Sequence, residues 1–494
     1  KQIYRDEISH VKHGLRWFER WRSPEQTQWQ AYRSALPEPL SPARAKGIGF
    51  NRKGRLRAGL QAEYIDELEI FSRSRGRCPD VFWFNPNCEG EVASGRAGDQ
   101  ASKLVSQLAE DLRALPMLYC AQDDVVLVEH RPSVDFLRRL RGLGFTVPEF
   151  VEYGSGGAGV KELAERKLHG LRPWGWSPQS ATFLKPLADG LASGEALRWR
   201  SDWQVLYSKA WSAERLRAFL RESNDAWLCD ADVVGRVCQT VDAVEALLAD
   251  WAAWDEVVIK AAIESSGRGH IHARGGQLRP EQRGWLDRVL ARHGAVVVEP
   301  WLDKVQDLSL HLDVDAHGQV QVAGWTRFFT DARGQYRGTL VGQMVSGLDE
   351  ETKKFLYGDG RDPRRLQRLG EQLGHHIGAA LAQLGYVGPV GVDALVYRSG
   401  SDLRLKPIVE INPRTSMGRV ALALRQRVNS ARTALWLVVT QREAQAAGFD
   451  TLGKWAERSA AAWPARLAED GAQLSEGALF VTDPTRARTC AGLL

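Results

Sequence analysis

Long apolar runs, a cysteine framework and a strong net charge are all absent from this sequence of 494 residues. Its longest strongly apolar run, residues 434–439, is far below the roughly 20 residues that a membrane helix needs. The six cysteines form no CxxC pair, which argues against structural zinc and a disulfide framework. The net charge of +5 is small for this length and gives no electrostatic case for binding nucleic acid. No charged and then apolar stretch typical of a signal peptide opens the sequence, so we expect a cytoplasmic protein without nucleic-acid or membrane partners.

Common nucleotide and nucleophile motifs are also missing or incomplete. The Walker-type pattern G-x-x-x-x-G-K-[ST] does not occur. Residues 154–159 match G-x-G-x-x-G, but residues 174–184 lack the acidic residue that a dinucleotide site places about 20 positions later. We therefore favour a flexible connection there. No Cys–His or Ser–His arrangement indicates a nucleophile, and we expect His375 and His376, inside a predicted helix, to be structural.

The chain is too long for a single core, and its patterns divide it into several units. Residues 1–75 are polar and are expected to form an N-terminal arm and linker. Residues 76–170 alternate between predicted strands and helices, which is typical of a small α/β domain with a parallel sheet. Residues 443–494 are expected to form a helical appendage with a final strand at 478–483. The predicted fold class is α/β (α+β).

Two apolar strands near residue 400 end in polar side chains. Asp393 lies on one strand, and Glu410 and Asn412 end the next after a connection short enough for a hairpin, so their oxygen atoms should converge. Hard oxygen ligands of this kind suit magnesium. A glutamate inside a core strand also needs a cation. Arg414 follows them and could fork onto a phosphate or a carboxylate.

A second cluster predicts a place for a nucleotide. Lys260 ends an apolar strand and precedes a loop whose glycines let backbone N–H groups form an anion nest. That loop consists of Ser265, Ser266, Gly267, Arg268 and Gly269. A later apolar strand runs into a segment suited to hold an adenine between apolar walls, and an acidic residue beyond it could accept from a ribose hydroxyl. These residues are Glu299, Pro300, Trp301, Leu302 and, for the ribose, Asp307.

This ordered set resembles the ATP-grasp superfamily of ligases over roughly residues 180–440. The resemblance implies an N-terminal lobe at 171–297 that carries the lysine and the glycine-rich flap. It also implies a C-terminal lobe at 298–442 that carries the metal set Asp, then Glu-x-Asn, followed by an arginine. Asp307 departs from the pattern, since a glutamate is more usual there. A small α/β domain ahead of the two lobes also fits the family.

The resemblance implies that ATP phosphorylates a carboxylate and that an amine, less often a thiol, then displaces the phosphate. It implies ATP and two Mg2+ ions, for which Mn2+ could substitute. Lys260 and the flap would steady ADP, and Arg414 would hold the acyl phosphate. Either Lys209 or Lys185 would reach the phosphates.

Several assignments stay open at this point. Arg327 and Arg337 are candidates for second-line contacts to phosphate or acid substrate, with a solvated hairpin as the alternative. A phosphotransferase acting on a hydroxyl and a non-catalytic nucleotide-binding protein are the alternative functions. We expect small-molecule carboxylate and amine substrates, including amino acids or a peptide. Their identity should depend on the N-terminal domain, on residues 171–203 and on residues 415–419.

Overall fold

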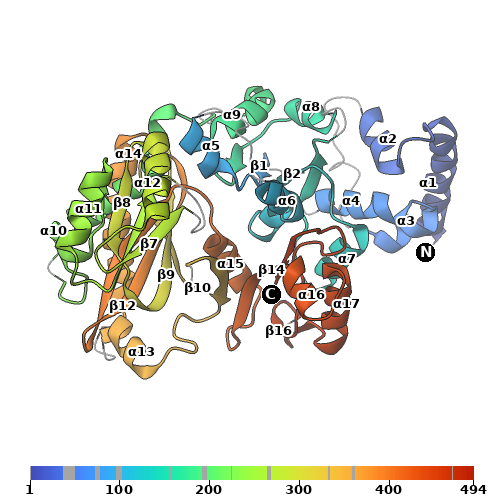
Figure 1. The fold of residues 1–494 in the computed structure, drawn as a ribbon. Coiled ribbons are helices and arrows are strands. Elements are labelled where there is room, and N and C mark those ends of the chain that lie inside the picture. The colour runs from blue at the N-terminus through green and yellow to red at the C-terminus, as the bar shows by residue number, and fades with distance from the viewer. Residues whose placement is uncertain are drawn as a thin grey trace.

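The computed structural model describes most of the chain (Figure 1). The described residues are 2–36, 50–72, 78–95, 103–154, 158–191, 197–223, 225–263, 269–331, 334–358, 362–469 and 471–494. Among them, no helix is both long enough and apolar enough to cross a bilayer. The predicted flap residues Ser265, Ser266, Gly267 and Arg268, and Gly156 of the glycine pattern, lie outside the described residues.

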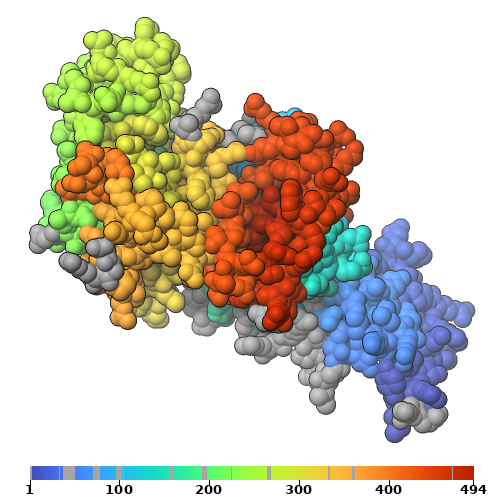
Figure 2. Space-filling view, turned by 90° about the horizontal axis from the view of Figure 1, so that it is seen from below, coloured from blue at the N-terminus to red at the C-terminus, as the bar shows by residue number. Residues whose placement is uncertain are grey.

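The N-terminal residues form a separate helical unit at one end of the molecule (Figures 1 and 2). Its helices are α1 (Gln2–Trp21), α2 (Gln28–Ala35), α3 (Arg52–Ala58) and α4 (Ala62–Ser72). Trp29, Tyr64, Ile65 and Leu68 form a small core of their own. In Figure 2 this unit is blue and lies opposite the green segment that follows residue 200.

The next unit is a four-stranded parallel sheet in the order β3-β2-β1-β4. Its strands are β1 (Asp80–Trp83), β2 (Val125–Val128), β3 (Glu149–Glu152) and β4 (Gly170–Pro173). The associated helices are α5 (Cys88–Ser94), α6 (Lys103–Asp111), η2 (Leu115–Leu118), α7 (Val134–Gly142) and α8 (Ala158–Ala164). Every residue of β2 is buried, as expected for a strand covered on both faces. The predicted small parallel-sheet domain is confirmed.

Two antiparallel sheets follow, and the cleft described below lies between them. The first has the order β5-β8-β6-β7, with β5 (Arg236–Cys238), β6 (Glu256–Ala261), β7 (His270–Arg274) and β8 (Val296–Pro300). Its helices are α11 (Val241–Asp250) and α12 (Pro280–His293), and Val244, Leu248 and Leu286 pack with the strands in one core. The connecting helices before it are α9 (Pro178–Leu184), η3 (Lys185–Gly190), η4 (Ser201–Tyr207), α10 (Lys209–Glu222) and η5 (Ala231–Val233).

The second antiparallel sheet has seven strands in the order β13-β12-β9-β10-β11-β14-β17. Its strands are β9 (Asp303–Val314), β10 (Val320–Thr330), β11 (Tyr336–Val341), β12 (Gly388–Ser399), β13 (Asp402–Asn412), β14 (Ala434–Thr440) and β17 (Cys490–Leu493). Helices α13 (Glu350–Tyr357), α14 (Arg365–Gln383) and α15 (Met417–Arg425) accompany it. The predicted order, a small parallel-sheet domain and then a two-lobed fold, is thus observed.

The predicted hairpin is formed by β12 and β13. Asp393 lies opposite Glu410, and Gly391 lies opposite Asn412. On its other side, β12 pairs with β9, where Asp393 lies opposite Ser309. This register brings Ser309, Asp393 and Glu410 side by side on three neighbouring strands.

The C-terminal residues add α16 (Gln441–Ala446), α17 (Leu452–Ala462), β15 (Arg466–Leu467) and β16 (Leu474–Glu476). The terminal strand is β17, which pairs with β14 and extends the large sheet. The strand expected at 478–483 is not formed as such. Phe480 makes an isolated bridge with Leu493, and Leu479 and Val481 hydrogen-bond through their backbone to Leu494 and Gly492. Pro484 follows and lacks the N–H that further pairing would need.

Candidate active site

A cleft of about 200 Å³ between the two antiparallel sheets gathers most of the predicted nucleotide and metal residues. It is lined by Lys209, Lys260, Gly269, Glu299, Pro300, Trp301, Leu302, Asp307, Asp393 and Glu410. They come from strands β6, β8, β9, β12 and β13, from the start of α10, from the residue before β7 and from the connection between β8 and β9. The convergence expected from the sequence is therefore present in the structure.

Glu299 lies between two lysines on the floor of this cleft. Its Oε1 pairs with Lys260, and its Oε2 is 2.6 Å from the Nζ of Lys406. Burial would raise the pKa of the Glu299 carboxyl, but the two ammonium groups outweigh burial and lower the pKa to about 2. Lys406, only 4% exposed, was not predicted. A lysine inside the apolar strand "LKPIVEI" was the available signal.

Asp393, Glu410 and Asn412 lie close together, and the first two line one end of the cleft. The amide Nδ2 of Asn412 donates to Asp393 Oδ2 at 3.1 Å. Burial, and then the charge of Glu410, raise the pKa of Asp393 to about 7. Among the described residues, no group of three or more His, Cys, Asp or Glu side chains could hold a metal. Asp393, Glu410 and Asn412 are a smaller set, which offers two carboxylates and one amide oxygen. Few protein oxygens, together with a carboxyl that holds its charge poorly without a nearby cation, fit Mg2+ completed by water and phosphate oxygens.

Lys209 reaches the predicted metal set of Asp393, Glu410 and Asn412, and Lys185 does not. Lys209 is the first residue of α10, and its ammonium pairs with Glu410. Burial would raise the pKa of Glu410, but the charge and hydrogen bond of Lys209 lower it. Lys185 begins the short helix η3 and does not line the cleft.

The other end of the cleft has an aromatic and acidic lining. Trp301 stacks against His270 with ring centroids 6.4 Å apart. Burial and the neighbouring His272 lower the pKa of His270 to about 4, so this ring is neutral near pH 7. Asp307 accepts from the hydroxyl of Thr330 at 3.0 Å and from Lys304 at 2.8 Å. These groups offer a flat apolar wall and polar partners for a base and a sugar.

Arg414 joins the small domain to the metal set. Its Nε donates to Glu89 Oε1 at 2.7 Å, and its Nη2 reaches Asn412 Oδ1 at 3.4 Å. Burial alone would lower the pKa of Arg414, but the Glu89 carboxylate raises it. Glu89, in the first turn of α5, was not predicted as a partner. The guanidinium is therefore charged and held in a fixed direction.

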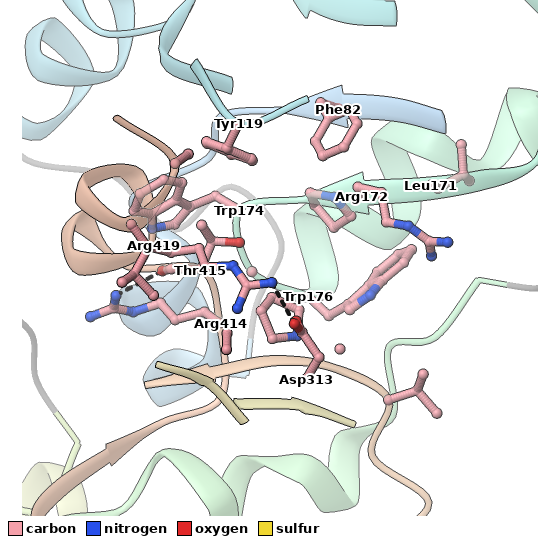
Figure 3. A pocket seen from close by; sticks show the side chains of 18 of the residues that line it. Phe82, Tyr119, Leu171, Arg172, Trp174, Trp176, Asp313, Arg414, Thr415 and Arg419 are labelled. Carbon is pink, nitrogen blue, oxygen red and sulfur yellow. Dashed lines mark hydrogen bonds and ion pairs between the residues drawn. The ribbon is translucent and has the colours of Figure 1, made fainter. Parts of the chain in front are cut away.

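Arg414 lines a second and larger cavity of about 710 Å³ (Figure 3). This cavity lies between the end of the parallel-sheet domain and α15. Residues from both stretches expected to govern specificity meet there, namely Leu171–Trp176, Arg198, Thr415 and Arg419. Asp313 of β9, also in the lining, was not predicted.

The structure does not bring Arg327 and Arg337 to either cavity. Arg327 is 4% exposed and donates to Gln306 Oε1, at 3.0 and 3.1 Å, and to the carbonyls of Met344 and Ser346. Its donors thus fasten β10 to the segment after β11, which corrects the expectation of a contact to phosphate or acid substrate. Arg337 pairs at the surface with Glu443.

His376 has structural partners, as expected. Its ring nitrogens lie 3.2 Å from Glu222 Oε2 and from the carbonyl of Arg215, both on α10. These contacts tie α14 to α10.

Comparisons with known proteins give a partial picture. Residues 1–66 match a family described as "Protein of unknown function (DUF455)". No curated protein matches the chain. Among solved structures, N5-carboxyaminoimidazole synthetase from Staphylococcus aureus, complexed with ADP, has a TM-score of 0.41 at 11% identity and covers 84% of this chain and 92% of its own.

Two further solved structures represent other enzymes. Biotin carboxylase from Campylobacter jejuni, in a β,γ-ATP complex, has a TM-score of 0.40 at 11% identity, over 74% of this chain and 76% of its own. D-Alanyl-alanine synthetase A from Vibrio cholerae has a TM-score of 0.32 at 11% identity, over 50% and 67%. Likeness at this level assigns no activity, so the proposal below rests on the side chains of this chain.

Proposed function

We propose that this protein is an ATP-dependent ligase of the ATP-grasp type, which activates a carboxylate as an acyl phosphate and couples it to an amine. One observation carries the proposal. A cleft lined by Lys209, Lys260, Asp393 and Glu410 adjoins, through Arg414, a second cavity large enough for another substrate. A nucleotide and an acid bound in these two places would meet at the metal set.

The cleft residues suit a nucleoside triphosphate. The apolar segment Pro300–Leu302 and the ring of His270 would enclose the base, and Asp307 would accept from the ribose. Lys209 and Lys260 are paired with carboxylates, and phosphate oxygens would compete with those carboxylates for the two ammonium groups. The charges that phosphates need are thus already in position.

Asp393, Glu410 and Asn412 would hold magnesium, which supplies charge neutralisation at the β- and γ-phosphates when bound. The acid substrate's carboxylate oxygen would form a bond to the γ-phosphorus while the bond to the bridging oxygen breaks and ADP leaves. Arg414, held by Glu89, would bind the acyl phosphate and stabilise the oxyanion that forms as the amine attacks. Phosphate would leave with its electron pair, and the amine would lose its proton. No nucleophilic side chain is needed.

The test is ADP release from pools of acids and amines, with mass spectrometry of the products. The proposal predicts ADP formation that needs both an acid and an amine, and a product mass equal to their sum less one water. Glu410→Gln is the matched control and should lose this activity. A stable phosphate ester formed from a hydroxyl compound without any amine would instead establish a phosphotransferase.

A further inference from the structure

The lining of the 710 Å³ cavity is strongly cationic. Its charged side chains are Arg172, Arg198, Arg414, Arg419, Arg425 and, as the one acid among them, Asp313. Guanidinium groups therefore outnumber carboxylates on the surface that a ligand in this cavity would meet. Its volume lies within the range of about 300–1,000 Å³ typical of small-molecule sites, and it exceeds what one small acid would fill.

Arg419 lies in the middle of this cavity (Figure 3). Its Nη2 pairs with Asp313, which comes from β9 below it in the view. Its Nη1 is buried and has no hydrogen-bond partner among the described residues. A buried charged N–H without an acceptor is costly. The Arg419 side chain is 28% exposed, so a small rotation of the guanidinium would bring Nη1 to an anionic oxygen of a ligand in the cavity.

Two other arginines are held in place by acids that do not line the cavity. The Nε of Arg172 forms an ion pair with Asp80 at 3.2 Å, and Arg414 donates to Glu89 at 2.7 Å. Such pairing fixes the direction of each guanidinium and leaves other N–H groups for a ligand. Phe82 and Tyr119, with ring centroids 5.7 Å apart, add an apolar wall for the body of that ligand.

The position of Arg414 determines which end of a ligand would lie next to the metal set. Its contact with Asn412 places one end of the cavity against the metal set. A carboxylate at this end would face the γ-phosphate, while Arg419 lies in the same cavity with an unsatisfied N–H. A ligand with that one carboxylate alone would therefore leave Nη1 of Arg419 without an acceptor.

We propose that this cavity binds the acid substrate, and that this acid carries at least one further anionic group, a carboxylate or a phosphate, which Arg419 binds. The inference rests on the proposed ligase function, from which the roles of the reacting carboxylate and of Arg414 are taken. It assigns to Arg419 the selection of polyanionic over monoanionic acids.

The test is isothermal titration with three probes, namely triglutamate, 3-phosphoglycerate and trialanine. Trialanine shares the backbone of triglutamate and lacks its side-chain charges. We expect at least one anionic probe to bind at least tenfold more tightly than trialanine. Comparing the affinities for triglutamate and 3-phosphoglycerate distinguishes a carboxylate from a phosphate as the second group. Arg419→Ala should weaken that binding at least tenfold, and Arg419→Lys should weaken it less.

Arg432→Ala, outside the cavity lining, is the matched control and should bind the probes as the wild type does. Mg-ADP should bind equally to all four proteins, which also shows that the variants are folded. Failure of both anionic probes, equal affinity for trialanine, or binding that is insensitive to Arg419→Ala would each overturn the inference. If Mg-ADP binds normally in that case, the ligase proposal survives. Absence of Mg-ADP binding to the wild type would overturn both.

Discussion

Replacing Glu299 with glutamine would leave Lys260 and Lys406 around a neutral amide inside the nucleotide cleft. In the wild type both carboxylate oxygens are engaged, one by each ammonium. Lys406 is 4% exposed and Lys260 is 18% exposed, so water cannot replace the lost partner fully. The variant therefore buries two like charges without a counter-ion.

The size of the effect follows from the pKa of Glu299. The pKa of this carboxyl group falls from an ordinary value of 4.5 to about 2. Each tenfold change in proton affinity corresponds to about 1.4 kcal/mol, so the folded state gains about 3 kcal/mol from the ionised carboxylate. Because the pKa is lowered on folding, this stabilisation is complete above pH 4.5 and is lost as the pH falls through about 2.

Thermal melting at pH 7 and at pH 3 checks this prediction. At pH 7, Glu299→Gln should melt roughly 6–12 °C below the wild type, at about 2–4 °C per kcal/mol for a folding unit of 150–250 residues. The difference should shrink at pH 3. Glu476→Gln, which removes a carboxylate from an exposed pair with Arg466, should change the melting temperature little. A loss at pH 7 no larger than that of this control would refute the reasoning.

Three further predictions concern the metal set, Arg327 and one glycine. Glu410→Gln should lower turnover at least about a hundredfold, or about 2.7 kcal/mol in the activation free energy, and near-normal ADP release would contradict the metal assignment. Arg327→Met should destabilise the fold by about 2–3 kcal/mol, measured by urea unfolding, because Gln306 and backbone carbonyls lose their donor. The kcat/KM of this variant should stay normal, and a large fall would instead indicate that Arg327 contacts the substrate. Gly418→Ala would place a Cβ 2.5 Å from the His311 ring. It should lower the melting temperature by an amount equivalent to about 1–3 kcal/mol, and an unchanged melting curve would contradict this packing.

The sequence predicted the hairpin that carries the metal set because its evidence is local. Both strands are apolar, the connection is short, and the side-chain period of two places Glu410 and Asn412 on one face. Features of this kind can be predicted because they depend on residues that are close in the sequence. The pairing of Asp393 with Glu410 needs more than that connection. The register set by Ser399 and Asp402 would place Asp393 opposite Ile408, and a register shift between Asp393 and Leu395 brings it opposite Glu410 instead.

The partners of these residues could not be predicted, because they come from distant parts of the chain. The sequence indicated that Glu410 needs a cation, yet the cation that the structure supplies is Lys209, 201 residues away. Glu89, which holds Arg414, is 325 residues from it. Arg327 carries the same charge as Arg414 but folds back onto its own sheet, and only tertiary packing separates the two cases.

Calorimetric titration of the protein with a non-hydrolysable ATP analogue and magnesium tests most directly whether the cleft between the two antiparallel sheets holds Mg-ATP. We expect one binding event per chain, which weakens when EDTA removes the metal. Glu410→Gln should weaken binding in the presence of magnesium by at least about tenfold. No binding by the wild type, or binding that depends neither on magnesium nor on Glu410, would contradict a Mg-ATP site in this cleft.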